Sequence, residues 1–127
     1  MAKIKKLKPI RKLMGDLDDI FSKFIRQRDA GICFTCGNTK EPKYQQCGHY
    51  ISRGVFNTRY DEENCHCQCV ACNIFKKGNM DEYAIRLIRF YGKGILEKLH
   101  AKKEQSKKFT REELEEKTEH YKKLVKD

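Results

Sequence analysis

Two stretches decide the fold of this chain: GICFTCG at residues 31–37 and CHCQCVACN at residues 65–73. Each stretch contains one Cys-x-x-Cys pair, and the four cysteines are Cys33, Cys36, Cys69 and Cys72. Two residues between thiolates let both sulfurs reach one ion, and two such pairs complete a closed tetrahedral S4 site suited to structural zinc. The alternative, buried free cysteines or redox pairs, has to explain the same spacing twice. The sequence therefore predicts one structural Zn²⁺ ion.

The composition agrees with a small domain that gains stability from a metal. Of the 127 residues, 39% are hydrophobic and 36% are charged, which permits only a modest core. Lys and Arg number 28 against 18 Asp and Glu, a net charge of +10 that favours nucleic acid as partner ahead of an acidic membrane surface. Seven cysteines, an odd number, and a Lys-rich opening without an apolar signal segment favour a metal-binding role in a reducing cytoplasm. We expect no membrane span.

Apolar spacing predicts a leading helix before the cysteine-rich centre. The first residues, 1–12, form a basic arm that is either a solvated tail or a segment lying on phosphates. From Leu13 to about Arg28 the apolar residues recur at helical spacing. Short strands are expected near Gln46–Ser52 and Cys65–Gln68, with a short helix after Cys69.

A helical tail is expected after the cysteine-rich centre. The predicted helices cover Asp81–Tyr91, about Ile95–Lys102, and a last segment from a capping box at Thr110–Glu113 to about Lys126. The last helix is so highly charged that we expect it to pack weakly or on a partner. The fold class is α+β, with a basic arm at 1–12, a zinc-bound domain at 13–92 and a charged helical extension at 93–127.

Polar residues between and just after the cysteine pairs could carry phosphodiester hydrolysis. That reaction needs a general base, a divalent metal on the phosphate and cations for the remaining charge. His49, on a strand, can be the base, and Asn73 can present its amide oxygen to Mg²⁺ from a position fixed by Cys72. Taken singly, His49 could be a core histidine, Asn73 a helix cap and Asn64 a turn former. Their joint spacing favours the functional interpretation.

Basic residues near these candidates could bind the DNA backbone. Arg53 and Arg59 are candidates for clamping phosphate, because Arg grips phosphate with two parallel hydrogen bonds. A solvated surface role is the alternative for each. Lys76 and Lys77, at the end of the short helix, are expected to make non-specific backbone contacts.

Three further cysteines, Cys47, Cys65 and Cys67, lie outside the two pairs. Cys65 and Cys67 alternate along a strand and so share one face, where they could be small core residues or alternative ligands. His66, between them, could be a structural hydrogen bonder or a contributor to the site.

Together these residues match a known pattern. The pattern Cys33-x2-Cys36, Gly48-His49, Asn64, Cys69-x2-Cys72-Asn73 resembles the HNH, or ββα-metal, nucleases, in the variant where Asn replaces the last His. More closely, the stretches FIRQRDAGICFTCG, CGHY, DEENCHCQC and ACN…KKGN resemble the NinG/Rap recombination proteins of lambdoid phages. This likeness covers about Lys8–Tyr91. The layout is also similar to that of phage endonuclease VII, a junction resolvase.

The resemblance implies an HNH-like nuclease core within residues 13–92 and a structure-directed endonuclease of phage recombination. It implies that His49 activates water, that Asn73 holds a catalytic Mg²⁺ or Mn²⁺, and that Asn64 braces the loop and orients the base. Many of these nucleases carry a second metal ligand just before the base, where this chain has Gly48. Cys47 or His66 could contribute instead.

The implied partners are branched DNA and other phage recombination proteins, in the host cytoplasm. Resolution of a DNA junction would favour two active sites, so a homodimer joined through the charged C-terminal helix would suit this reaction. Two other functions stay open: a non-catalytic zinc-finger DNA-binding accessory protein, for which His49 and Asn73 would be dispensable, and an RNA-binding zinc protein.

Overall fold

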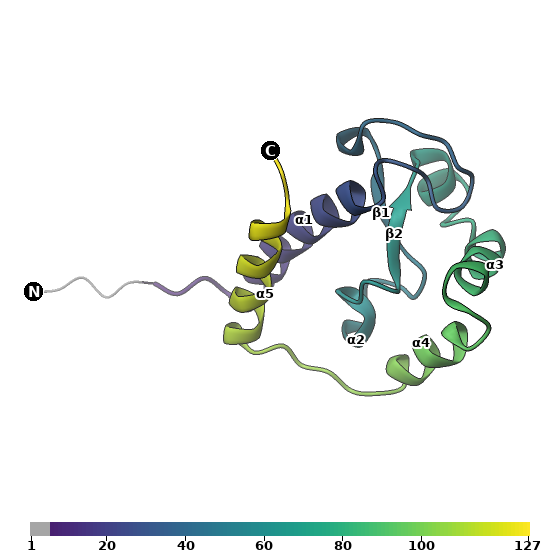
Figure 1. Ribbon diagram of the computed structural model, residues 1–127. Coiled ribbons are helices and arrows are strands. Elements are labelled where there is room, and N and C mark those ends of the chain that lie inside the picture. The colour runs from purple at the N-terminus through teal and green to yellow at the C-terminus, as the bar shows by residue number, and fades with distance from the viewer. Residues whose placement is uncertain (1–5) are drawn as a thin grey trace, which may run out of the picture.

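Helices surround a small two-stranded sheet in this α+β chain, whose structure is a computed structural model (Figure 1). The structure describes residues 6–127, so the first five residues of the expected basic arm lie outside the described part. The helices are α1 Ile10–Arg28, α2 Phe56–Arg59, α3 Met80–Tyr91, α4 Ile95–Lys103 and α5 Arg111–Leu124. Two short helical turns are η1 Pro42–Tyr44, of 3₁₀ type, and η2 Ala71–Phe75, of π type. The strands are β1 Gln46–His49 and β2 Cys65–Gln68.

Helix α1 confirms the predicted leading helix and begins slightly earlier, at Ile10, after Pro9. Its buried face carries Leu17, Phe21 and Ile25 at helical spacing. The helix ends at Arg28, and the backbone then turns left-handed at Ala30 and Gly31, with φ of 53° and 71°. A Cβ atom at Gly31 would lie 1.8 Å from the carbonyl oxygen of Lys40, so this turn requires glycine.

The two strands pair antiparallel, with Cys47 opposite Cys67, Gly48 opposite His66 and His49 opposite Cys65. Because side chains alternate along a strand, Cys47, His49 and Cys65 share one face and Gly48 and His66 share the other. Helix α1 covers the first face, where Cys65 joins its core. The second face meets α3, whose Tyr83 hydroxyl donates to the Gly48 carbonyl at 2.7 Å. The sheet therefore lies between two helices.

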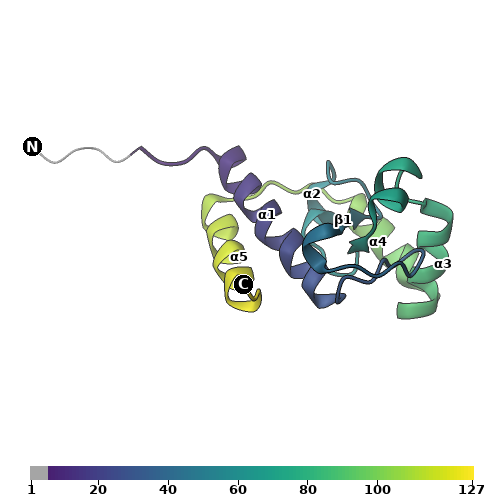
Figure 2. The same cartoon turned by 90° about the horizontal axis from the view of Figure 1, so that it is seen from above.

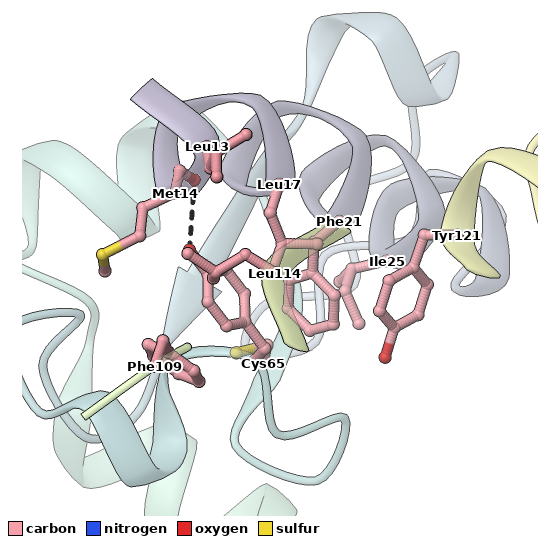
Figure 3. Packing of buried hydrophobic residues seen from close by; sticks show 10 residues of the cluster. Leu13, Met14, Leu17, Phe21, Ile25, Cys65, Phe109, Leu114 and Tyr121 are labelled. Atoms are coloured by element: carbon pink, nitrogen blue, oxygen red, sulfur yellow. Dashed lines mark hydrogen bonds between the residues drawn. The ribbon is translucent and has the colours of Figure 1, made fainter. Parts of the chain in front are cut away.

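One hydrophobic cluster joins α1, α5 and the sheet (Figure 3). Leu114 and Tyr121 of α5 are 0% and 5% exposed, and the ring of Tyr121 meets that of Phe21 edge-on at 5.0 Å. Helices α1 and α5 lie side by side in both views (Figures 1 and 2). The expectation that the last helix packs weakly is therefore wrong, because two buried residues one heptad apart suffice to dock it. Its predicted cap is confirmed, with Thr110 Oγ1 accepting from the Glu113 N–H at 3.1 Å.

A second cluster joins α3, α4 and Ile51, and it fixes His66. Since the Tyr83 hydroxyl donates to Gly48, it accepts from the protonated Nδ1 of His66 at 3.0 Å, and Nε2 accepts from the Tyr91 hydroxyl at 2.7 Å. Burial, with the charge of Arg28, lowers the pKa of His66 to about 4, so its ring stays neutral at neutral pH. Of the two roles left open for His66, the contacts match the structural hydrogen bonder.

None of the helices within residues 6–127 combines the length and the apolar character needed to cross a bilayer.

Candidate metal and catalytic site

The four paired cysteines meet at one point, as predicted. Their sulfur atoms all lie within 4.8 Å of one another, and those of Cys36 and Cys69 are 3.7 Å apart. Four thiolates about 2.3 Å from a tetrahedral zinc ion would be separated by about 3.8 Å. The four-cysteine cluster therefore fits a Zn²⁺ ion in donor type, number and spacing.

Hydrogen-bond donors around the four-cysteine cluster support negatively charged sulfur. The Asn38 N–H donates to Cys36 and the Cys72 N–H donates to Cys69, each at 3.4 Å. Asn79 donates its amide to Cys72 at 3.6 Å, and the Thr35 hydroxyl lies 3.4 Å from Cys33. Donors of this kind stabilise thiolate ligands and hold them in position. Sequence reasoning missed Thr35 and Asn79, although Thr35 lies inside the first cysteine pair.

His49 and Asn73 line one cavity of about 490 Å³, here called the His49 cavity. His49 ends β1, whereas Asn73 lies in η2 directly after Cys72 of the four-cysteine cluster. Arg53 and Asp19 also line the cavity, and both are exposed, so it opens to solvent. The structure thus brings together two of the three predicted catalytic residues, with one predicted DNA-binding arginine beside them.

The imidazole of His49 is held in one tautomer. Its Nε2 lies 2.9 Å from the carbonyl oxygen of Arg59, which can only accept a hydrogen bond, so Nε2 carries the proton. In a neutral ring the lone pair is then on Nδ1. Burial lowers the pKa of His49 below its usual 6.5; the positive charge of Arg53 adds to this, and the bond to Arg59 opposes it. His49 is therefore neutral at neutral pH, the form in which it can accept a proton.

Asn64 is fully buried behind the cavity and braces the loop between the strands. Its Oδ1 accepts from the Ile51 N–H at 2.8 Å, and its Nδ2 donates to the carbonyls of Ile51 at 3.1 Å and Thr58 at 3.0 Å. The Asn64 side chain binds both the N–H and the carbonyl of Ile51, which in a longer strand would bond to β2. This is why β1 ends at His49 and not at Ser52, where the sequence predicts its end. Thr58 directly precedes Arg59, so the brace also fixes the carbonyl that holds His49.

Replacing Asn64 with alanine is expected to lower the free energy of unfolding by about 3 kcal/mol, because each buried backbone group left without a partner costs about 1–3 kcal/mol. Chemical denaturation of the zinc-loaded protein measures the change. The matched control is Asn57→Ala in the same loop, where Asn57 donates to Lys102 and Gln105 at a more exposed position. A loss no larger than that of the control would show that Asn64 is no brace.

The predicted DNA-binding residues differ in their surroundings. Arg59 donates from Nε to Asp18 Oδ1 at 2.9 Å and from its terminal nitrogen to Asp18 Oδ2 at 2.5 Å, which ties α2 to α1. Arg53 is exposed at the His49 cavity. Lys76 and Lys77 are exposed just beyond η2. Arg59 would have to break its ion pair with Asp18 to bind a phosphate. Arg53, Lys76 and Lys77 are exposed and would not have to break such a pair.

The space beside Gly48 leaves no room for a side chain at that position. A Cβ atom at Gly48 would lie 1.8 Å from Oε1 of Gln68. Gln68 is fully buried, and its Nε2 donates to Thr35 at 3.1 Å and to the Gly78 carbonyl at 2.9 Å. The side chain of Gln68 therefore occupies the volume that any side chain at position 48 would need, on the face of the sheet opposite His49.

Oxygen donors reach the His49 cavity from elsewhere. Asn73 donates its Nδ2 to Gln46 at 2.8 Å, which leaves its amide oxygen as the atom suited to a cation. Asp18 and Asp19 of α1 line the same cavity, and sequence reasoning missed both. Their signal was the acidic run DLDD at residues 16–19 in a strongly basic chain, but only the packing of α1 on the sheet brings these residues to His49.

Comparison with known proteins relates the chain to phage proteins. The sequence profile of the family described as "Bacteriophage Lambda NinG protein" matches residues 1–127. The chain is 33% identical over 103 residues to the protein ninG of Escherichia phage 933W, covering 78% of this chain and 51% of that relative. Over the same length it is 33% identical to the ninG protein of Salmonella phage P22 and 32% identical to that of Escherichia phage lambda, with 50% of each covered. The chain thus spans about half the length of these curated relatives. No solved structure matches it.

Proposed function

The chain belongs to the NinG family of phage proteins, and from that premise we propose that it is a metal-dependent endonuclease that hydrolyses DNA phosphodiesters during phage recombination. One observation carries the proposal. A neutral histidine with its lone pair on a defined nitrogen lines the same cavity as an asparagine that is fixed by the adjoining zinc-cluster cysteine. The order of β1, β2 and the short helix η2 supports an HNH-like, or ββα-metal, core.

In the proposed reaction His49 is the general base. Its Nδ1 accepts a proton from water as the water oxygen attacks phosphorus and the P–O bond to one deoxyribose oxygen breaks, so that this oxygen leaves. The Nε2–H bond to Arg59 holds the ring in place while positive charge develops on it. Asn64 keeps the Arg59 carbonyl in position through its bond to Thr58. Arg53, exposed beside His49, can offset negative charge on the phosphate.

The catalytic divalent metal would be held by oxygen donors of the His49 cavity. The amide oxygen of Asn73 and the carboxylate of Asp19 are ligands of the kind that Mg²⁺ and Mn²⁺ prefer. Asp18 is less suited, because both of its carboxylate oxygens are bound by Arg59. A divalent ion bound there would stabilise charge on the phosphate and the leaving oxygen. Many related nucleases place their second metal ligand just before the base, where this chain has Gly48. We therefore assign the role of second metal ligand to Asp19.

The substrate proposed is branched DNA, as the family resemblance implies. The net charge of +10 and the exposed lysines beyond η2 support a polyanionic partner. Phe75, 80% exposed and two residues after Asn73, supports unpaired bases as part of the target, because an exposed aromatic ring offers them a stacking surface. A homodimer would bring two His49 cavities to one DNA junction, which suits cleavage of two strands. Contacts with other phage recombination proteins are also part of this proposal.

Wild type loaded with one Zn²⁺ per chain is expected to cut a labelled four-way junction in Mg²⁺ or Mn²⁺, and Asn73→Ala is expected to remove most of that activity. Asp19→Asn should raise the Mg²⁺ concentration needed for half-maximal cleavage at least about tenfold, since even residues that only support metal ligands cost about 10–100-fold in affinity. Gel analysis of cleavage across a Mg²⁺ series measures both effects, with linear duplex compared in parallel.

The matched control is Asp16→Asn, which removes the same charge from α1 where the carboxylate is bound by Lys8 and Lys12. Equal Mg²⁺ requirements in the two aspartate variants would contradict the role of Asp19 alone. Absence of cutting by folded, zinc-loaded wild type would overturn the nuclease proposal in favour of a zinc-finger DNA-binding or RNA-binding protein, which binding assays with each nucleic acid would distinguish.

A further inference from the structure

Three side chains that can bind a soft metal lie together beside the His49 cavity, separate from the four-cysteine cluster. They are Cys47, His49 and Cys65, and their candidate ligand atoms all lie within 4.8 Å of one another. The strand register produces this group, because Cys47 and His49 share a face of β1 and Cys65 is paired opposite His49. Both cysteines carry free thiols.

The backbone carbonyl of Arg59 marks where two of these side chains converge. It accepts from His49 Nε2 at 2.9 Å and from the Cys65 thiol at 3.6 Å. Cys47 and His49 also line the His49 cavity, whereas Cys65 is fully buried behind them. An ion entering from solvent would therefore meet two ligands on the cavity wall and the third beneath them.

We propose that Cys47, His49 and Cys65 form a second metal site, selective for thiophilic ions such as Zn²⁺. Two thiolates and one imidazole are a zinc donor set that leaves one position for water, and here that position would face the cavity. Binding releases the two thiol protons to solvent, and the imidazole binds through whichever ring nitrogen lacks a proton. Mg²⁺ prefers oxygen ligands, so the second site does not serve the ion assigned to Asn73 and Asp19.

Occupation of this second site would switch off the proposed base, a consequence that rests on the proposed function. If the ion binds Nδ1 of His49, it takes the lone pair that would accept the proton from water. If it binds Nε2, the ring proton moves to Nδ1 with the same result. Zinc would thus support the fold at one site and inhibit hydrolysis at the other.

Cobalt provides a test that needs no nuclease activity. Co²⁺ binds thiolate sites more weakly than Zn²⁺, so it can be added to protein that holds one Zn²⁺ per chain without displacing the structural ion. We expect wild type to take up one Co²⁺ per chain, with the visible absorption of a tetrahedral thiolate site and unchanged zinc content. Cys47→Ser should remove this absorption and the bound cobalt. Cys47 is suited to replacement because it is only partly buried.

Cys67→Ser is the matched control, since Cys67 lies opposite Cys47 on the same face of the sheet but outside the three-residue group. It should bind cobalt as wild type does, and His49→Gln should bind it at least tenfold more weakly. Wild type that keeps one Zn²⁺ per chain and binds no cobalt would overturn the proposal, as would equal cobalt binding by Cys47→Ser and wild type. Zinc content and circular dichroism establish that each variant is folded.

Discussion

Replacement of His49 by alanine is expected to lower the rate of junction cleavage by about 10²–10⁴-fold, the usual contribution of a positioned general base. The reason is specific to the geometry: the bond from Nε2 to the Arg59 carbonyl places the only lone pair of the neutral ring on Nδ1. Single-turnover cleavage with enzyme in excess measures the chemical step. His100→Ala is the control, because His100 is an exposed histidine of α4 outside the His49 cavity.

The pH dependence of cleavage gives a second readout of the same assignment. The base form of His49 is neutral, and burial lowers its pKa, so cleavage should fall with decreasing pH only below the range in which an ordinary histidine becomes protonated. The His49→Ala variant should lose this acid limb and regain activity with added imidazole. Unchanged cleavage in His49→Ala would refute the base assignment and leave the fold intact.

Removal of zinc from the four-cysteine cluster is expected to have the largest effect on stability. Structural zinc sites contribute about 10–16 kcal/mol of binding free energy in zinc-finger peptides, which exceeds the total stability of most small domains. The three buried cysteines of the cluster, Cys33, Cys69 and Cys72, form a group of their own, apart from both hydrophobic clusters, so the burial of these side chains depends on the metal more than that of the rest of the core. Unfolding should therefore begin there.

Chelation followed by hydrogen exchange would locate that unfolding. Protection should be lost first in residues 31–38 and 69–79, before it is lost in α1 and α5. Thermal melting and circular dichroism should change together with the measured zinc content, and Cys72→Ser should reproduce the effect. Melting that stays the same after verified zinc removal would contradict a structural role for the ion.

Local patterns allowed part of this molecule to be predicted from its sequence. The spacing within each cysteine pair predicted the four-cysteine cluster, and the apolar period from Leu13 predicted α1, because both depend on residues close in the chain. The docking of α5 was missed, since Leu114 and Tyr121 are few among charges and their burial depends on a distant helix. The catalytic role of His49 and Asn73 remains a prediction. What the structure adds is that one cavity holds both residues.

The rest of the candidate site depends on contacts that sequence spacing does not reveal. Asp19 reaches the cavity only because α1 crosses the sheet, and the early end of β1 follows from the side chain of Asn64 replacing a strand partner. The ion pair between Arg59 and Asp18 joins residues 41 positions apart. Arg59, which the sequence suggested as a phosphate-binding residue, is thus held by Asp18, and its backbone carbonyl in turn holds His49.

The close fit of Gln68 against Gly48 makes these two positions epistatic. A carboxylate introduced at position 48 alone would collide with a buried side chain, and a shorter residue at position 68 alone would leave a cavity and unpaired groups at Thr35 and Gly78. Each single step is costly, and only the pair together would be compatible with the packing. A side chain at position 48 is therefore expected to be tolerated only with a shorter residue at position 68, and directed evolution of this pair should mutate both codons in one library.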